Sequence, residues 1–424
     1  MSSKAAAVGI VPAAWDVEDL RYFLDLITYG FTNPMPDAEE GPWKLTAKDV
    51  VNGRINYGTA RRTTVEAFKN KLTDKSRPEV GDVLLTKDGS IGRVAVVDRD
   101  GVCINQSVAL LRPKKNIIPD FLKYLLLSPH YQRVMEGDSD GSTIKHIYIT
   151  RVDKMQVAVP PLAEQREILK VVGSLDDRLT LLRETNATLE SIAQALFKSW
   201  FVDFDPVHAK AEGLEPQAMD ATTAALFPDS FEESEFGLVP KGWRVGKVED
   251  VMDLPYGKAL KSTDRTDGVV PVYGSGGITG YHNESLVDGP SIIIGRKGTV
   301  GSLYWEDRPF FPIDTVFYVK AKQPLTYCYY LLKTLGLEGM NTDGAVPGLN
   351  RNNAYRLQVT VPSLPVLKAF DNVVADVREK IFANSQNAKT LTQLRDTLLP
   401  RLISGQLRLP EAEMVVQSTL SEAS

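Results

Sequence analysis

Two glycine-rich turns carry the residue types that could bind phosphate groups. The first is KDGSIGR, from Lys87 to Arg93, and the second is GRKGTVG, from Gly295 to Gly301. Glycines, small hydroxyls and cations together would let backbone amides and basic side chains approach a nucleic-acid backbone closely. Tight β-turns without any ligand use the same residues, so both interpretations stay open. The candidate residues are Lys87, Ser90, Arg93, Arg296, Lys297 and Thr299.

Three further segments offer groups that could contact base edges. YGSGGITGYHN, starting at Tyr273, supplies Tyr273, Ser275 and His282, although a plain loop is the alternative. TIKHIYITR and GLNRNNAY each combine a basic residue with a potential base reader and each precede a predicted strand, so a purely structural connection is an equal alternative. Their candidates are Lys145, His146 and Arg151 in the first, and Asn350, Arg351 and Asn352 in the second.

Motifs for catalysis are missing from the sequence. The nearest approaches to the Asp/Asn-Pro-Pro-aromatic motif of adenine methylation are NPMP at Asn33 and DPVH at Asp205, and both lack the second proline and the aromatic residue. GSGGITG has Thr279 where a dinucleotide fingerprint needs glycine, and no G-x-x-x-x-G-K-[ST] loop is present. The four histidines are scattered, and Cys103 and Cys328 stand in apolar contexts typical of buried residues. We expect no catalytic residue, metal or cofactor in this chain.

Charge is distributed unevenly along the 424 residues, which carry a net charge of -5. Residues 203–235 hold nine acids against Lys210 alone, a local charge of -8, so the rest of the chain carries +3. A basic face elsewhere is therefore compatible with the acidic total, and an ordinary solvated surface is the alternative. The acidic stretch, with scattered alanine and proline and no apolar period, predicts a solvated connector that tolerates neutralising substitutions.

Hydrophobic residues at 43 % and charged residues at 24 % exclude a disordered or fibrous chain. No apolar run approaches the ~20 residues that a membrane span needs. The first residues are too broken by Gly9 and Pro12 for a signal peptide, so a cytoplasmic location is expected.

An internal repeat organises the chain. GIVPAAWDVEDLRYFLDL from Gly9 matches GLVPKGWRVGKVEDVMDL from Gly237, and KDGSIGRV matches RKGTVGSL with Gly89 on Gly298 and Gly92 on Gly301. From Gln156 and Gln358 onward the two copies are 202 residues apart. Each copy is predicted to be a β-rich module, with one short helix (DFLKYLLLS or TYCYYLLKTL), that ends in a strand (MQVAV or LQVTV) and continues into a long helix.

The long helices show a coiled-coil seam. The first, from Glu164 to about Val202, has apolar residues at strict sevens from Ile168 to Leu196, with a second series four residues later, and the second helix repeats this pattern from Phe370. Pro400 should end or kink the second helix near its last turn. Such seams need a partner, and the nearest candidate is the other copy.

The register of an antiparallel pair follows from the two asparagines in the seam. Setting Asn186 opposite Asn384 gives partners whose numbers sum to 570, which matches seam with seam and avoids burying a lone amide. The exception is Leu175 opposite Arg395, whose guanidinium should then extend into solvent.

The joining segments resemble those of the DNA-specificity subunit of type I restriction-modification systems. The resemblance rests on VPPLAEQREIL and VPSLP before the helices, ALFKSWFVDFDPV from Ala195, LLPRLISGQL from Leu398, and FGLVPKGW at Phe236 with PVYGSGGITGYHNE at Pro271. It implies an α+β fold with two tandem target recognition domains, each followed by a long helix, the helices packing as an antiparallel coiled coil. The expected domains are recognition domain 1 at 1–160, a central helix at 161–202, an acidic linker at 203–236, recognition domain 2 at 237–362, a C-terminal helix at 363–405 and a tail at 406–424.

The resemblance also implies a non-catalytic role in which each recognition domain reads one half of a bipartite double-stranded DNA site. Two modification subunits would supply S-adenosylmethionine binding and adenine methylation, with or without restriction and translocase subunits that use ATP and Mg. The tail GQLRLPEAEMVVQ lacks a counterpart of FKSWFVDFD, so the two ends are expected to meet their partner subunits unequally. The competing hypothesis is a coiled-coil adaptor whose paired modules bind protein, and a steep loss of DNA affinity with salt would separate the two.

Overall fold

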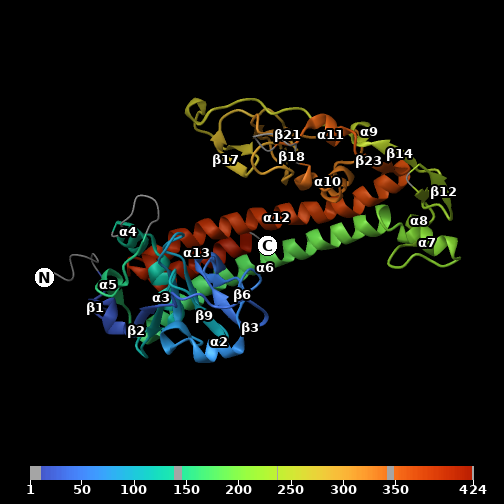
Figure 1. Ribbon diagram of the computed structural model, residues 1–424. Helices are drawn as coiled ribbons and strands as arrows, with labels where there is room; N and C mark the ends of the chain where they lie inside the picture. Colours follow the sequence, from blue (N-terminus) through green and yellow to red (C-terminus); the bar gives the residue numbers. More distant parts are fainter. Residues whose placement is uncertain (1–10, 138–145, 236, 341–347, 423–424) are drawn as a thin grey trace. The chain divides into compact units, whose positions relative to one another are not determined.

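The computed structural model describes residues 11–137, 146–235, 237–340 and 348–422. The chain divides into two compact units, one made of residues 1–181 and 387–424, the other of residues 182–386 (Figure 1). Each unit contains one of the two sequence repeats together with half of each long helix.

The first unit contains one β-rich module. Its strands are β1 (Asp16–Asp19), β2 (Leu24–Tyr29), β3 (Ala38–Leu45), β4 (Val50–Val51), β5 (Arg54–Ile55), β6 (Arg61–Arg62), β7 (Val83–Thr86), β8 (Val94–Val96), β9 (Val102–Ile104), β10 (Val108–Pro113) and β11 (Gln156–Val159). A four-stranded sheet in the order β2-β10-β7-β8 and a three-stranded sheet in the order β6-β3-β9 contribute aliphatic side chains to one core. The short helices are α2 (Val65–Asn70), α3 (Pro119–Leu127), α4 (Pro129–Gly137) and α5 (Ile149–Val152).

The second unit repeats this plan with strands of different lengths. They are β12 (Phe231–Ser234), β13 (Gly237–Pro240), β14 (Arg244–Lys247), β15 (Met252–Asp253), β16 (Val270–Gly274), β17 (Gly277–His282), β18 (Ser291–Gly295), β19 (Leu303–Glu306), β20 (Phe311–Pro312), β21 (Val316–Tyr318), β22 (Lys320–Ala321) and β23 (Gln358–Val361). Its module helices are α9 (Val248–Val251), α10 (Leu325–Thr334) and α11 (Arg351–Tyr355).

The pairing of strands confirms the repeat. Among the named strands that the structure describes, each module has a matching parallel pair, β3 with β9 in the first and β16 with β20 in the second. The predicted closing strands are also present, because β11 pairs with β1 and β23 pairs with β14. The predicted short helices are α3 and α10, and Cys103 and Cys328 are both free and buried.

The two long helices are α6 (Leu162–Phe201) and α12 (Leu364–Ile403), and both have 40 residues. Pro400 lies inside the last turn of α12, which ends three residues later, as predicted. Seam residues of both helices are buried, including Ile168, Leu179 and Phe370.

Within the second unit, α6 and α12 pack antiparallel in the predicted register. Asn384 Nδ2 donates a hydrogen bond of 2.8 Å to Asn186 Oδ1, and the Trp200 and Phe370 ring centroids lie 5.9 Å apart. Both pairs have numbers that sum to 570. The Asn186 amide also donates to the Ile381 carbonyl at 3.3 Å and to Ser385 Oγ at 3.2 Å, so its polar atoms are paired.

Within the first unit, the prediction for Arg395 needs correction. The guanidinium does not simply extend into solvent, because it donates to Asp176 Oδ1 at 3.0 Å and to Asp396 Oδ1 at 2.7 Å. Asp176 follows Leu175 and lies beside the seam, so an ion pair takes the place of the expected exposed cation.

The acidic connector is also more ordered than its composition predicted. It contains α7 (Asp205–Ala211) and α8 (Ala221–Ala224), and β12 pairs with β13. Phe227 is 2 % exposed and its ring centroid lies 5.1 Å from that of Trp200, while Val207 is fully buried. The expectation of a solvated connector holds for its nine acids, which are all exposed, but it needs correction for Val207 and Phe227, which are buried in the second unit.

The segment expected to be a tail contains a helix, α13 (Leu409–Glu422). Ala412 and Val416 are buried in the first unit, and their spacing of four places them on one helix face. Residues after the second seam therefore belong to the core of the first unit.

Candidate nucleic-acid interface

Each module brings three matched segments of the chain together. In the first module, the Ile147 amide donates to the Lys87 carbonyl at 2.8 Å, and Asp88 and His146 form an isolated antiparallel β-bridge through their backbones. In the second, the Leu349 amide donates to the Arg296 carbonyl at 2.8 Å, and Lys297 bridges to Gly348. The glycine-rich turns thus lie against the two later candidate segments, which sequence alone could not establish.

The glycine-rich turns connect β7 to β8 and β18 to β19. All four matched glycines are in the left-handed region, with φ of +77° and +79° at Gly89 and Gly92 and of +83° and +74° at Gly298 and Gly301. Glycine adopts this conformation without steric cost, so the motif is a tight β-turn in its backbone. At the tips of these turns Ser90, Lys297 and Thr299 are exposed.

A tyrosine completes the junction in each module, and our sequence predictions omitted it. Tyr29 ends β2 and Tyr256 follows β15, and both are 46 % exposed. Lys87 Nζ lies 5.2 Å from the Tyr29 ring centroid, whereas Arg296 and Arg351 lie 5.0 and 4.7 Å from that of Tyr256. The shared sequence signal is ITYG at Ile27 and LPYG at Leu254. We call these two groups the Tyr29 junction and the Tyr256 junction.

A glycine fixes the backbone after each tyrosine. A Cβ at Gly30 would lie 1.9 Å from the Ile104 carbonyl oxygen, and one at Gly257 would lie 2.1 Å from that of Ile313. No side chain fits at these distances, so each glycine allows the tyrosine strand to approach its neighbour.

The Tyr29 junction corrects the prediction for Lys87. This side chain is 7 % exposed and its Nζ donates to Asp88 Oδ2 at 2.8 Å, so it is a buried, paired cation rather than a free phosphate contact. Asp88 also contacts His146 Nδ1. Burial raises the pKa of Asp88, but the hydrogen bonds from Lys87 and His146 outweigh it and hold that pKa below its usual value.

The other candidates of the first module are less tightly grouped. Arg93 is exposed and donates to the Val50 carbonyl at 3.3 Å. Arg151 lies 4.9 Å from the Tyr148 ring centroid, and that ring lies 4.5 Å from the His146 ring. Lys145 lies outside the described residues.

The Tyr256 junction is more basic. Arg296 donates to the Asp314 carbonyl at 2.8 Å, and its guanidinium and that of Arg351 both lie over the Tyr256 ring. Asn350 is the N-cap of α11, because its side chain accepts hydrogen bonds from the Asn352 and Asn353 amides. The Asn350 Oδ1 atom therefore caps α11 and is already engaged in two hydrogen bonds. The predicted base reader has at least a structural role in this position. Ser275 is partly buried, and its carbonyl accepts from Ser302 Oγ at 2.6 Å.

Two predicted base readers belong to the core of the second module instead. Tyr273 is 6 % exposed and donates to Glu306 Oε2 at 2.9 Å. His282 is 7 % exposed, and its Nδ1 accepts from the Thr266 amide at 3.0 Å. Strands β16 and β17 place both side chains inward, so the structure does not favour the predicted contacts of Tyr273 and His282 with bases.

The Glu306 carboxylate is held ionised inside that core. Burial raises the pKa of Glu306, but two hydrogen bonds from the Arg308 guanidinium and one from Tyr273 hold it below its ordinary value. Burial raises the pKa of Tyr273 as well. Tyr273, Glu306 and Arg308 thus form a satisfied polar network, not a surface for bases.

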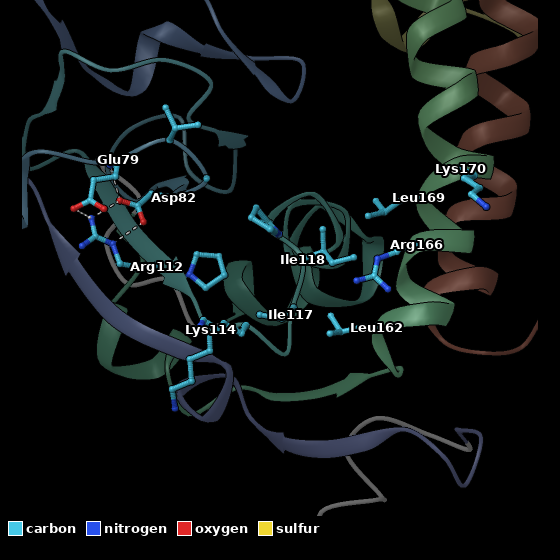
Figure 2. Close-up of a pocket in the computed structure, with 15 residues that line it drawn as sticks. Glu79, Asp82, Arg112, Lys114, Ile117, Ile118, Leu162, Arg166, Leu169 and Lys170 are labelled. Carbon is cyan, nitrogen blue, oxygen red and sulfur yellow. Dashed lines mark hydrogen bonds and ion pairs between the residues drawn. The ribbon is translucent and has the colours of Figure 1, made fainter.

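Figure 2 shows an open groove in the first unit beside the beginning of α6. Ile118, Leu162 and Leu169 give it an apolar lining, while Arg112 forms a bidentate pair with Asp82 at 2.8 Å. Its charged side chains are thus partly committed to each other. Among the described residues, no group of three or more metal-ligating side chains converges anywhere, and no helix is long and apolar enough to cross a membrane.

In the described residues, the two β-rich modules share one plan. Each lies beside part of an antiparallel helix pair and places at least one cation over an exposed tyrosine ring, so the chain is a tandem two-module protein. The family model described as the type I restriction modification DNA specificity domain matches this chain twice, at residues 29–191 and 240–399. The chain therefore belongs to this family of DNA specificity subunits.

Known relatives agree over most of their length. The HindI specificity subunit of Haemophilus influenzae is 28 % identical over 404 residues, which cover 77 % of this chain and 86 % of the relative. The MjaIX specificity subunit of Methanocaldococcus jannaschii is 25 % identical and covers 96 % of this chain and 97 % of its own. The crystal structure of the type I S subunit from M. genitalium has the same fold, with a TM-score of 0.54, 22 % identity and coverage of 93 % and 96 %.

Proposed function

We propose that this chain is the non-catalytic subunit that recognises a bipartite double-stranded DNA site, with one half-site for each module. The observation that carries this proposal is the double family match over two modules that bring the same three segments together at Tyr29 and Tyr256. A coiled-coil adaptor that binds protein would not be expected to match a DNA specificity model in both modules. DNA is therefore the favoured ligand.

The Tyr256 junction supplies suitable chemistry for DNA. Guanidinium groups stacked on an exposed ring keep their N–H edges available for phosphate oxygens or for guanine O6 and N7. Lys297, exposed one residue after Arg296, adds a mobile cation of the kind that contacts phosphates. In the Tyr29 junction, Asp88 occupies the place of Lys297 and puts an acid paired with Lys87 and His146 where the second module has an exposed cation, so the two modules should prefer different half-sites.

The helix pair is proposed to set the spacing between the half-sites. Antiparallel helices of one length, each following one module, would give half-sites about one to one and a half helical turns apart. Inserting four residues, about one turn, into α6 should then lengthen the preferred spacer. An unchanged spacer would contradict the proposal that the helix pair sets the distance between the half-sites.

Partner subunits are proposed to perform the chemistry. Two modification subunits would bind S-adenosylmethionine and methylate adenine, and restriction subunits, where present, would use ATP and Mg. The two ends of the helix pair would meet these subunits unequally, since only one carries the FKSWFVDFD segment. Because the proposed assembly would act on the DNA of the cell, we propose a cytoplasmic location for it.

The decisive experiment is methylome sequencing of a host that expresses this chain with its modification subunit. Wild type should methylate one split motif, and Arg351→Ala should relax one half of it by about 1–3 kcal/mol of discrimination while the other half stays unchanged. Loss of both halves together would indicate misfolding. No methylation and no DNA affinity would favour the protein-binding adaptor instead.

DNA binding by the assembled complex offers a second test. Lys297→Ala should reduce the magnitude of the log-log salt slope by about 1 with little change of sequence preference. Lys241→Ala, at another exposed position of the second unit, is the matched control and should leave the slope unchanged. Equal slopes for both variants would show that the turn of β18 and β19 faces away from DNA.

A further inference from the structure

The polar contacts of the helix pair are distributed unequally between the two helices. Two acids, Asp176 and Glu190, lie on α6, and the two arginines that pair with them, Arg395 and Arg378, lie on α12. Arg378 Nη1 lies 3.2 Å from Glu190 Oε2 in the second unit, and Arg395 Nη1 lies 3.0 Å from Asp176 Oδ1 in the first. The Asn186 and Asn384 pair is the third contact.

Each ion pair is tied to the module beside it. Glu190 also accepts a hydrogen bond of 3.1 Å from Tyr330 of α10 and pairs with Lys333, and Asp176 accepts one from Tyr124 of α3. Tyr124 and Tyr330 occupy matching places in the two repeats. The side chains are between 11 and 26 % exposed, so these charges are well shielded from water.

The sequence repeat allows the observed pair of α6 with α12 to be compared with a like pair, meaning two copies of the same helix from two copies of the chain. The first like pair is α6 with α6. Because the copies are 202 residues apart, a second copy of α6 in the place of α12 would put Asp176 where Arg378 lies, directly opposite Glu190. Leu182 would take the place of Asn384, opposite Asn186. By two-fold symmetry, each unfavourable approach would occur twice.

The same comparison applies to a pair of α12 helices. Arg378 of the second copy would take the place of Asp176, opposite Arg395, and Ala388 would take the place of Asn186, opposite Asn384. Both like pairs therefore replace an ion pair by two like charges and an amide pair by two lone amides, although the apolar seams would still match.

We propose that these three contacts make the helix pair selective, so that α6 accepts α12 and rejects the like helix of a second copy. The apolar seam, which recurs in both helices, supplies the packing without distinguishing between partners. The polar contacts determine whether α6 pairs with α12 or with the α6 of a second copy. The subunit is thereby kept asymmetric, with two different modules joined, and symmetric pairs of identical halves are excluded.

The full-length double variant Asp176→Arg/Arg378→Glu tests this selectivity. It reverses the sign of the charge at both positions without changing the net charge. Within one chain it puts a guanidinium opposite Arg395 and a carboxylate opposite Glu190. Between two copies it gives every charge an opposite partner in both like pairs. The control Asp176→Arg/Arg395→Asp has the same first substitution and the same net charge but keeps opposite charges together within one chain.

Two measurements are made on the purified full-length chains: thermal unfolding, and co-purification of two differently tagged copies expressed together. The reversed variant should unfold about 3–6 °C below the control and should retain several-fold more of the second copy. Equal values for the two variants would overturn the proposal. A lower unfolding temperature without any gain of the second copy would also overturn it, because the charges would then affect stability and not the choice of partner.

If the reversed variant fails to fold, Asp176→Asn/Arg378→Gln provides the test. It removes the attraction within the chain and the repulsion between copies without creating like charges within one chain. The co-purified fraction should rise above that of the parent chain, and an unchanged fraction would count against selectivity.

Discussion

Asn384 Nδ2 lies 2.8 Å from Asn186 Oδ1 in the seam between the long helices, and Asn384 is 4 % exposed. Asn384→Leu should destabilise the protein by about 1–3 kcal/mol, because Asn186 Oδ1 then loses its donor inside the seam. The double change to leucine should recover that loss and broaden the spacer in the methylated motif, since nothing polar then fixes the register. Thermal unfolding and methylome sequencing measure the two effects. A double variant as unstable as the single one would contradict this account.

The close approach of Gly257 to the Ile313 carbonyl yields a second prediction. Gly257→Ala should destabilise the second unit by about 1–3 kcal/mol and weaken recognition of one half-site, because the strand carrying Tyr256 must move. Gly276→Ala is the control, since a Cβ there meets open space. Differential scanning fluorimetry and the methylated motif provide the measurements. If the two variants behave alike, the position of Tyr256 does not depend on this contact.

Tyr273 is predicted to matter for stability and not for sequence preference. Tyr273→Phe removes one hydrogen bond from the buried Glu306 carboxylate and should cost about 1–3 kcal/mol while the methylated motif stays the same. Tyr281→Phe, at a 50 % exposed position of the same YGSGGITGYHN segment, should leave the unfolding temperature unchanged. A changed motif after Tyr273→Phe would restore its role as a base reader.

Glu190 should make stability depend on pH in the acid range. Burial raises its pKa, but hydrogen bonds from Lys333 and Gln194 and the charges of Lys333 and Arg378 hold that pKa below the usual 4.5. A lowered carboxyl pKa gives stability that is present above 4.5 and is lost as pH falls through the folded value.

The unfolding temperature of Glu190→Gln should therefore lie below wild type at neutral pH, and the difference should shrink as pH falls below 4.5. Glu184→Gln, an exposed position on the same helix, is the control and should follow wild type throughout. A difference between Glu190→Gln and wild type that stays constant with pH would show that the carboxylate is not stabilised by its neighbours.

The register of the long helices could be predicted to the residue because its signal is repeated, whereas the start of the first helix lies two residues before the expected Glu164. A heptad seam from Ile168 to Trp200 has many members, and the Asn186 and Asn384 pair selects one register among them. The glycines of the two turns were equally predictable, because a left-handed conformation at four matched positions requires that residue.

The site was predicted less well because exposure depends on tertiary packing. Lys87 and Arg296 occupy matching places, yet one is buried against Asp88 and the other covers Tyr256. Tyr273 and Tyr281 belong to one short segment, and only the register of β16 and β17 determines that the first points inward. Phe227 lies in a connector that has no apolar period, although it packs against Trp200. Whether such side chains are buried or exposed depends on their neighbours in the folded structure.

The order of synthesis affects the two units differently. The second unit is one continuous stretch, residues 182–386, whereas the first needs residues 387–424 as well. Those last residues pack tightly against its beginning, since a Cβ at Gly405 would lie 2.4 Å from Pro12 Cδ. At ordinary ribosomal speeds the intervening stretch takes roughly 10–40 s to translate. Residues 1–181 must therefore wait, with the apolar seam from Ile168 to Leu179 uncovered, until residues 387–403 of α12 have been made.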